Sequence, residues 1–176
     1  MKILNSNRLR LRKLTEKDAD FIVALLNDPD WLKYIGDRGV KDKQDAIVYI
    51  QQGPQTMYQQ HGMGLLLVES VAQKLPIGLC GLLTREELAH PDLGFAFLPE
   101  YRDQGLALDA AKLVLADAYQ RLSIPKILGL TSLDNHKSIH LLEKLGFKYK
   151  GLIALKDSAA KTRLFELECE INNPLL

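Results

Sequence analysis

The residues best suited to chemistry lie in the segment 99–107, PEYRDQGLA, between two apolar stretches. Leu93–Leu98 before it predicts a buried strand, and Leu106–Leu122 after it is rich in Ala and Leu and predicts a long helix. Backbone N–H groups therefore gather at a helix N-terminus, where they lack intrahelical partners and the helix dipole is positive. Gly105 allows close approach, and Arg102 adds a guanidinium suited to phosphate. We predict a phosphate or pyrophosphate site; an ordinary loop with a solvated Arg102 is the alternative.

A second group of polar residues follows Lys126–Thr131, which has the length and apolarity of a buried strand. Asn135 is suited to cap a helix that runs to Leu145, and Gly146 is placed to end it. Ser138 lies in the first turn of this helix. Capping of the helix is the alternative to a role in chemistry for both polar residues.

Both motifs resemble those of the GNAT N-acetyltransferases. The pattern Arg-x-x-Gly-x-Ala at residues 102–107 is similar to the family's acetyl-CoA pyrophosphate loop, and it is neither a Walker loop nor a Rossmann fingerprint. Asn135, Ser138 and the sequence Leu-Gly-Phe at 145–147 match the family's second motif. Segments 8–19, 77–82 and 92–95 are similar to the ribosomal-protein acetyltransferase-like branch.

The resemblance implies an α/β (α+β) fold, a single GNAT domain spanning residues 1–176. Its central sheet is mixed, its fourth and fifth strands are parallel and splay apart around the cofactor, and helices cover both faces. The sequence alone predicts a βαβ unit from the strand, helix and strand around the two motifs, which requires a parallel pairing. Gly53-Pro54 predicts a break between two helices. The other elements are expected as strands near 8–14, 64–69, 76–84, 148–156 and 161–171, and helices near 16–26, 43–52 and 55–60.

The resemblance also implies the chemistry: an amine attacks the thioester of acetyl-CoA directly, without a covalent enzyme intermediate. The strand backbone at 95–98 would pair with the cofactor's pantetheine, and an N–H near Phe97 would polarise the thioester carbonyl. Ser138 is the candidate acid for the departing thiolate. The residues expected to bind the cofactor are Phe97, Leu98, Arg102, Asp103, Gln104, Gly105, Leu106, Ala107, Asn135 and Ser138.

The attacking amine must lose a proton, so a base or a chain of water molecules is needed. By family analogy Asp92, at the entry to the cofactor strand, is the first candidate base, and Glu69 is the second. A solvated carboxylate at a strand end is the alternative for each.

Acceptor specificity is expected in the N-terminal half, with Trp31, Asp37, Arg38 and His61 as candidate substrate-binding residues. A hydrophobic cluster beneath a long loop is the alternative for Trp31 and its apolar neighbours. The acceptor is expected to be a primary amine, either a protein N-terminus or a small molecule, and the sequence does not choose between them.

Composition excludes several other classes. The chain has 176 residues with 23 Lys and Arg against 22 Asp and Glu, so it lacks the basic excess of nucleic-acid binders. No apolar run approaches a membrane span, and the N-terminus lacks a signal-peptide core. Cys80 and Cys169 have no metal-ligand spacing, so we expect reduced thiols, no metal and a cytoplasmic protein; a homodimer stays open.

Two other functions stay open from the sequence. A non-catalytic CoA-binding or sensor module on the same fold would keep the loop 102–107 but turn over no amine. A nucleotide-binding protein would bind ATP or NAD as well as acetyl-CoA. The lack of a Walker lysine and of a paired acidic metal site weighs against the nucleotide.

Overall fold

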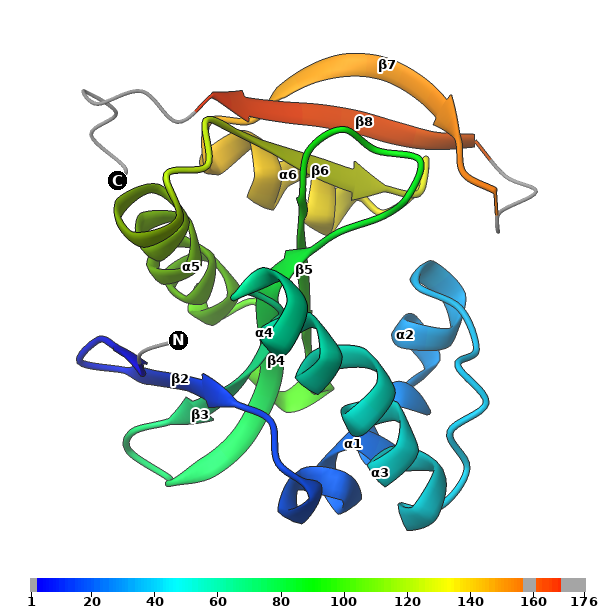
Figure 1. The fold of residues 1–176 in the computed structure, drawn as a ribbon, viewed down its shortest axis with the longest axis vertical. Coiled ribbons are helices and arrows are strands. Elements are labelled where there is room, and N and C mark those ends of the chain that lie inside the picture. The colour runs from blue at the N-terminus through cyan, green and yellow to red at the C-terminus, as the bar shows by residue number, and fades with distance from the viewer. Residues whose placement is uncertain (1–2, 157–160, 169–176) are drawn as a thin grey trace.

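A computed structural model describes residues 3–156 and 161–168 of the chain (Figure 1). One eight-stranded mixed sheet has the order β1-β2-β3-β4-β5-β6-β8-β7. The strands are β1 (Leu4–Asn5), β2 (Leu9–Lys13), β3 (Leu65–Ser70), β4 (Leu75–Leu83), β5 (Asp92–Phe97), β6 (Lys126–Thr131), β7 (Lys148–Ala154) and β8 (Lys161–Glu168). The expected single mixed sheet is confirmed. The chain has a short additional first strand, so the parallel pair expected as the fourth and fifth strands is numbered β5 and β6.

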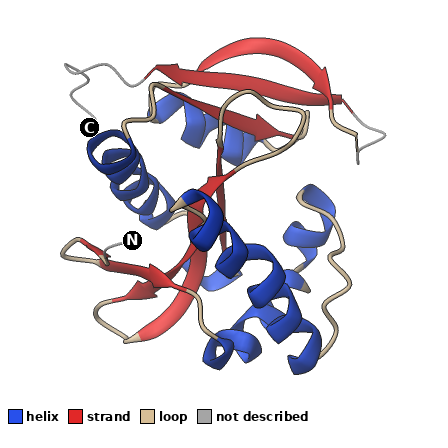
Figure 2. Ribbon diagram, viewed as in Figure 1, coloured by secondary structure: helices blue, strands red, loops and turns tan. Residues whose placement is uncertain are grey.

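Helices flank this sheet on both faces, as expected (Figure 2). The α-helices are α1 (Ala19–Leu26), α2 (Pro29–Tyr34), α3 (Lys43–Ile50), α4 (Thr56–His61), α5 (Leu106–Leu122) and α6 (His136–Lys144). Two 3₁₀ turns, η1 (Glu16–Asp18) and η3 (Pro99–Tyr101), and a π-helical turn, η2 (Gln51–Gln55), complete the set. The bounds of α5 and β6 are those that the sequence predicts.

Strand alternation divides the core into two clusters. In β3, Leu66 and Val68 are buried against α5 and α6, whereas Leu65 and Leu67 are buried with α1 and α3 on the opposite face. Successive side chains of a strand point to opposite faces, so a strand covered on both sides is apolar throughout. This explains why β3 is a continuous apolar run.

The parallel strands β5 and β6 pair only at their crossing point. The recorded register joins Asp92 to Leu128, where the Leu128 N–H donates to the Pro91 carbonyl at 2.8 Å. Beyond that point the strands leave in different directions, with β5 running toward η3 and β6 toward the start of α6 (Figure 1). The splay implied by the resemblance is therefore present, and it opens toward the carboxyl ends of both strands.

The predicted helix break at Gly53-Pro54 is wrong. The chain stays helical from α3 into α4 by widening into the π-helical turn η2. Proline has no N–H for the α-helical ladder. The wider turn accommodates Pro54 inside the helix, and the Thr56 hydroxyl donates to the Gln51 carbonyl at 2.9 Å.

Two further expectations concern cysteines and membranes. Cys80 is a buried free thiol, and burial raises its pKa, which keeps it protonated and unreactive. Cys169 lies outside the described residues. Within the described part of the chain, none of the helices has the length and apolarity to cross a membrane.

Candidate functional site

The loop between η3 and α5 presents unpaired backbone donors. Gly105 caps α5 in the left-handed conformation, with φ of 74°, and supplies no side chain to the helix end. Among the described residues, no acceptor takes the N–H groups of Gln104, Gly105, Leu106 or Ala107. These four donors lie at the N-terminus of a 17-residue helix, where the sequence predicts an anion site.

The same loop is open to a bulky ligand. A Cβ placed on Gly105 would find its nearest neighbour, an Arg8 guanidinium nitrogen, at 3.9 Å. Gln104 and Gly105 are both exposed. Free donors on an uncovered backbone fit the pyrophosphate that the resemblance implies.

The Arg102 guanidinium, expected at the pyrophosphate, makes three contacts within the protein. Its Nε donates to the Phe97 carbonyl at 2.8 Å, one Nη pairs with Asp30 at 2.6 Å, and the other pairs with Asp28. The Asp28 side chain is only 5% exposed, and a buried carboxylate needs such a partner. Arg102 thus fastens the loop to the N-terminus of α2.

Sequence reasoning missed Asp28 and Arg8. Asp28 caps α2, accepting from the N–H groups of Asp30 and Trp31, and the Asp-Pro pair at the helix start was the available signal. The guanidinium of Arg8 donates to the Gln104 carbonyl at 2.7 Å and pairs with Asp109 at 3.1 Å, which supports the loop from the outside.

The open edge of β5 carries the backbone groups expected to meet the cofactor. The Leu98 N–H donates to the Ile77 carbonyl of β4 at 3.0 Å. Because backbone groups alternate along a strand, the Phe97 N–H points to the opposite edge, into the splay. Leu98 therefore cannot offer its N–H to a cofactor, and Phe97 can.

Asn135 and Ser138 have separate roles at the start of α6. The Asn135 side chain caps the helix by accepting from the Ser138 N–H at 3.1 Å. The Ser138 hydroxyl has no hydrogen-bond partner among the described residues, and the residue is half-buried. The cap therefore belongs to Asn135, and the serine hydroxyl is available to a ligand.

Asp92 is a buried, paired carboxylate at the closed end of the splay. It is 2% exposed, and Arg85 donates to both of its oxygens, at 2.9 and 3.3 Å. Burial raises the pKa of Asp92 above its ordinary value, and the opposing effect of Arg85 does not cancel it. The alternative of a solvated carboxylate is wrong for this residue.

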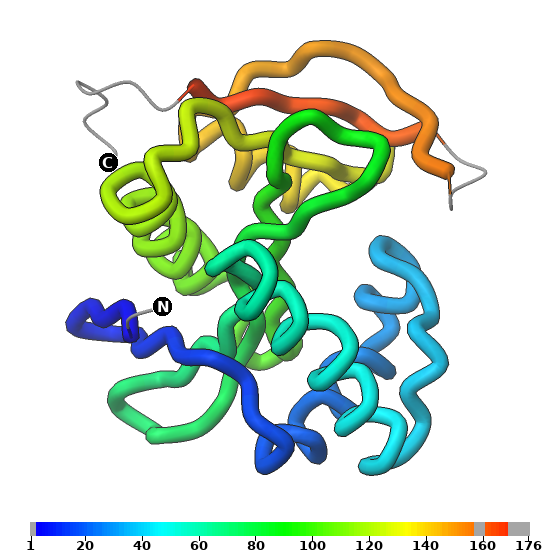
Figure 3. Tube along the Cα trace, in the orientation of Figure 1, coloured from blue at the N-terminus to red at the C-terminus, as the bar shows by residue number. Residues whose placement is uncertain are grey.

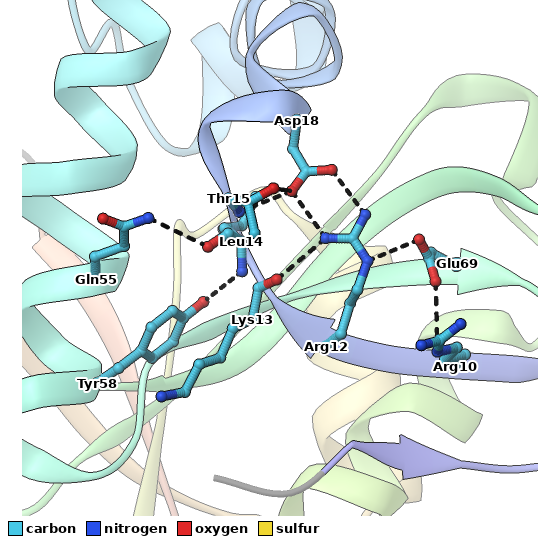
Figure 4. Close-up of polar contacts among 9 residues, drawn as sticks. All are labelled: Arg10, Arg12, Lys13, Leu14, Thr15, Asp18, Gln55, Tyr58 and Glu69. Carbon is cyan, nitrogen blue, oxygen red and sulfur yellow. Dashed lines mark hydrogen bonds and ion pairs between the residues drawn. The ribbon is translucent and has the colours of Figure 1, made fainter.

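Glu69, the second candidate base, belongs to an ion-pair network on β2 and β3 (Figure 4). Arg12 donates to Glu69 at 2.8 Å and to Asp18 at 2.7 Å, and Arg10 approaches Glu69 at 3.8 Å. Burial raises the pKa of Asp18, but hydrogen bonds from Arg12 and the Thr15 N–H outweigh it and hold the pKa low. This network joins β2 to η1 and β3, and we assign it a structural role.

The four candidate acceptor residues differ in burial and in local contacts. Trp31 is 5% exposed, packs in the core with α1 and α3, and donates from its indole to the Gly36 carbonyl at 3.1 Å. Asp37 is exposed and accepts from the Gly39 N–H at 2.7 Å in a tight turn. His61 is exposed at the end of α4. The core alternative is therefore correct for Trp31, whose buried ring cannot line an open cleft.

Arg38 borders a surface hollow beside the π-helical turn. The hollow is also lined by Val40, Tyr49, Gln52 and Gly53. Within the described residues, no ion pair joins Arg38 to Asp37. A π-helical turn often marks a functional position in a helix.

Helix α2 connects both arms of the splay. Asp28 and Asp30 hold Arg102 in the loop that follows β5, and Lys33 pairs at 3.2 Å with Asp134 in the loop that follows β6. Figure 3 shows the light-blue segment that contains α2 on the side toward which the two strands diverge. The short helix is thus fixed to the loops that follow both diverging strands.

Comparisons with known proteins agree with this geometry. Residues 8–148 match the family model described as an acetyltransferase (GNAT) domain. The uncharacterized N-acetyltransferase YoaA of Bacillus subtilis (strain 168) is 26% identical over 153 residues, 86% of this chain and 85% of that protein. Spermidine N(1)-acetyltransferase of Escherichia coli (strain K12) is 25% identical over 155 residues, 84% of this chain and 76% of that protein.

A solved structure shows the same fold at low identity. Ribosomal-protein-S5-alanine acetyltransferase from Vibrio fischeri is similar with a TM-score of 0.79 and 15% identity, covering 99% of this chain and 100% of that one.

Proposed function

Since this chain belongs to the GNAT acetyltransferase family and is an acyltransferase, we propose that it transfers the acetyl group of acetyl-CoA directly to a primary amine. One observation carries the proposal: the β5 edge that faces the splay leads to a loop with four N–H donors, and neither the edge nor these donors have a partner among residues 3–156 and 161–168. Acetyl-CoA supplies an acetyl group activated as a thioester. The chain binds and orients acetyl-CoA, accepts the proton that the amine loses and donates a hydrogen bond to the departing sulfur.

The residues divide this work by position. The N–H groups of 104–107 hold the pyrophosphate, and the β5 edge pairs with the pantetheine as an added strand would. The Phe97 N–H points into the splay and stabilises the negative charge that develops on the carbonyl oxygen. The Ser138 hydroxyl donates to the departing sulfur. Asp92 lies at the other end of β5 from Phe97, so it receives the amine proton through a chain of water molecules.

Asp92→Asn is expected to lower kcat/KM about 100-fold, the usual size of a lost proton-transfer group. The wild-type enzyme should gain activity with rising pH, because the carboxylate must be deprotonated to act. This rise should be centred above the ordinary aspartate pKa, since burial raises the pKa of Asp92. The measurement is a pH profile of kcat/KM for both proteins. The variant should lose the rise in kcat/KM with pH.

Glu69→Gln is the matched control, because it also removes an ion-paired carboxylate but lies in the β2–β3 network. Glu69→Gln should retain the rise in kcat/KM with pH. If Asp92→Asn also retains this rise, water or another group accepts the amine proton.

The acceptor is a peptide N-terminus or a small-molecule amine. The fold shared with a ribosomal-protein acetyltransferase supports the first, and the sequence relation to a spermidine acetyltransferase supports the second. The test is a panel of amines, with N-terminal peptides and spermidine as separate arms, assayed for acetyl-CoA-dependent thiol release. Acetyl-CoA binding without turnover on any arm would favour the non-catalytic alternative.

Asp37→Asn and Arg38→Gln are expected to raise the KM for the amine about tenfold, as loss of one charged contact would. Asparagine preserves the acceptor that the Gly39 N–H requires, so the turn should persist. The KM for acetyl-CoA should stay unchanged, because the cofactor contacts lie on β5, α5 and α6. Steady-state kinetics with both substrates varied is the measurement.

Asp20→Asn provides the control, since Asp20 is an exposed acid on α1 that pairs only with Lys43 among the described residues. If the amine KM is unchanged in both test variants, the acceptor site lies elsewhere, with the loop before Asp92 as the next candidate.

A further inference from the structure

One ion pair spans the cofactor site between its two arms. The Lys137 ammonium, in the first turn of α6, lies 2.6 Å from the Asp103 carboxylate in the loop before α5. Asp103 immediately precedes the free donors of residues 104–107 and adopts a left-handed φ of 59°. A lysine from the β6 arm therefore places its charge at the loop expected to hold the pyrophosphate.

The other cations around this loop are engaged elsewhere. Arg102 binds Asp28, Asp30 and the Phe97 carbonyl, and Arg8 binds Asp109 and the Gln104 carbonyl. Lys137 has Asp103 as its sole ion-pair partner among the described residues. A new anion at these donors can therefore take over this lysine by displacing one exposed carboxylate.

The pair is weak enough to exchange. The two side chains are 72% and 68% exposed, and exposed pairs contribute roughly 0–1 kcal/mol. An ammonium carries three donors and binds phosphate well as a point charge. A phosphate with greater negative charge than a carboxylate competes favourably for it.

Resting on the proposed function, we infer that Lys137 is an exchangeable phosphate ligand. In the free protein it pairs with Asp103, and in the complex it binds a phosphate of the cofactor. Asp103 is then a competitor that holds the lysine in place while its own charge opposes the incoming anion. Two neighbouring residues should therefore have opposite effects on cofactor affinity.

The experiment is isothermal titration of acetyl-CoA into the wild-type protein, Lys137→Gln, Asp103→Asn and the double variant. Lys137→Gln should weaken binding about tenfold, the effect of a charge-assisted hydrogen bond. Asp103→Asn should tighten binding about threefold by removing the competing charge. The double variant should bind at least tenfold more weakly than Asp103→Asn, because a direct phosphate contact is lost in both backgrounds.

Lys43→Gln is the matched control, because Lys43 forms a similar exposed pair with Asp20 at 3.0 Å on α3 and α1. It should bind acetyl-CoA as the wild type does. Thermal unfolding of each free variant separates a loss of ligand contact from a loss of fold, and all four single and double variants should unfold near the wild-type temperature.

Two results would overturn the inference. If Lys137→Gln binds normally, the lysine contacts no phosphate. If the double variant regains wild-type affinity, Lys137 merely neutralises Asp103. Failure of the wild-type protein to bind acetyl-CoA would instead reject the proposed function, so the two failures are distinguishable.

A parallel titration with dephospho-CoA identifies the phosphate. Dephospho-CoA lacks the 3′-phosphate and keeps the pyrophosphate. If Lys137→Gln still weakens binding of dephospho-CoA, Lys137 contacts the pyrophosphate. If Lys137→Gln no longer weakens binding, Lys137 contacts the 3′-phosphate. Either outcome supports a phosphate contact.

Discussion

Gly105→Trp is expected to abolish measurable acetyl-CoA binding in a protein that still folds. The glycine lies at the centre of the four free N–H donors, and its exposed backbone is the surface on which a pyrophosphate would rest. An indole there would cover that surface. The φ of 74° adds a cost of about 1–2 kcal/mol for an L-residue, which lowers stability without unfolding a domain of ordinary stability.

Gly39→Trp controls for this backbone cost. Gly39 has a similar φ of 69°, and a Cβ there would meet nothing within 4 Å. It should lose comparable stability and keep wild-type affinity. Titration calorimetry and thermal unfolding on both variants give the answer. Normal acetyl-CoA affinity in a folded Gly105→Trp protein would remove the cofactor from this loop.

Ser138→Ala is expected to reduce kcat by about 10–100-fold while changing acetyl-CoA affinity little. A hydrogen bond to the departing sulfur strengthens as negative charge develops there, so its loss raises the barrier more than it weakens binding. The serine hydroxyl is a weak acid, so we expect the lower part of the range for proton-transfer groups. Single-turnover rates and calorimetric affinities separate the two effects.

Asn135→Ala distinguishes chemistry from capping. It removes the acceptor of the Ser138 N–H and should cost about 1 kcal/mol of stability, the usual value of an N-cap. Ser138→Ala leaves that cap intact and should unfold at the wild-type temperature. A stability loss in Ser138→Ala with unchanged kcat would make the serine a structural residue.

Local sequence signals predicted much of the fold. The unbroken Ala/Leu run between Gly105 and Ser123 predicted α5, and Asn135 with Gly146 predicted both ends of α6. These signals work because caps and helix-breaking residues act within a few residues of themselves. The parallel pairing of β5 and β6 followed from their connection through a helix.

The contacts of the site could not be predicted in this way. Arg102 is separated by more than 70 residues from Asp28, and only the folded chain shows that a buried carboxylate takes the guanidinium. Trp31 looked as suited to a cleft as to the core, because an aromatic side chain fits either. Burial decides between them, and burial depends on how α1 and α3 pack.

The prediction of a helix break at Gly53-Pro54 failed for a different reason. Proline usually breaks a helix, yet a wider turn tolerates the missing N–H when flanking helices pack on the core. Ala46 and Ile50 before the turn and Tyr58 after it are all buried. Tertiary packing thus outweighs the local preference of two residues.

The position of α2 has a thermodynamic consequence. One short helix is joined by ion pairs to the loops after both β5 and β6, and it continues into the segment that carries Asp37 and Arg38. An acceptor that displaces α2 itself would change the free energy of the loop after β5. Linkage is reciprocal, so the cofactor must change the affinity for the acceptor by the same factor. The coupling between the two substrates would then depend on the ion pairs of five residues: Asp28, Asp30, Lys33, Arg102 and Asp134.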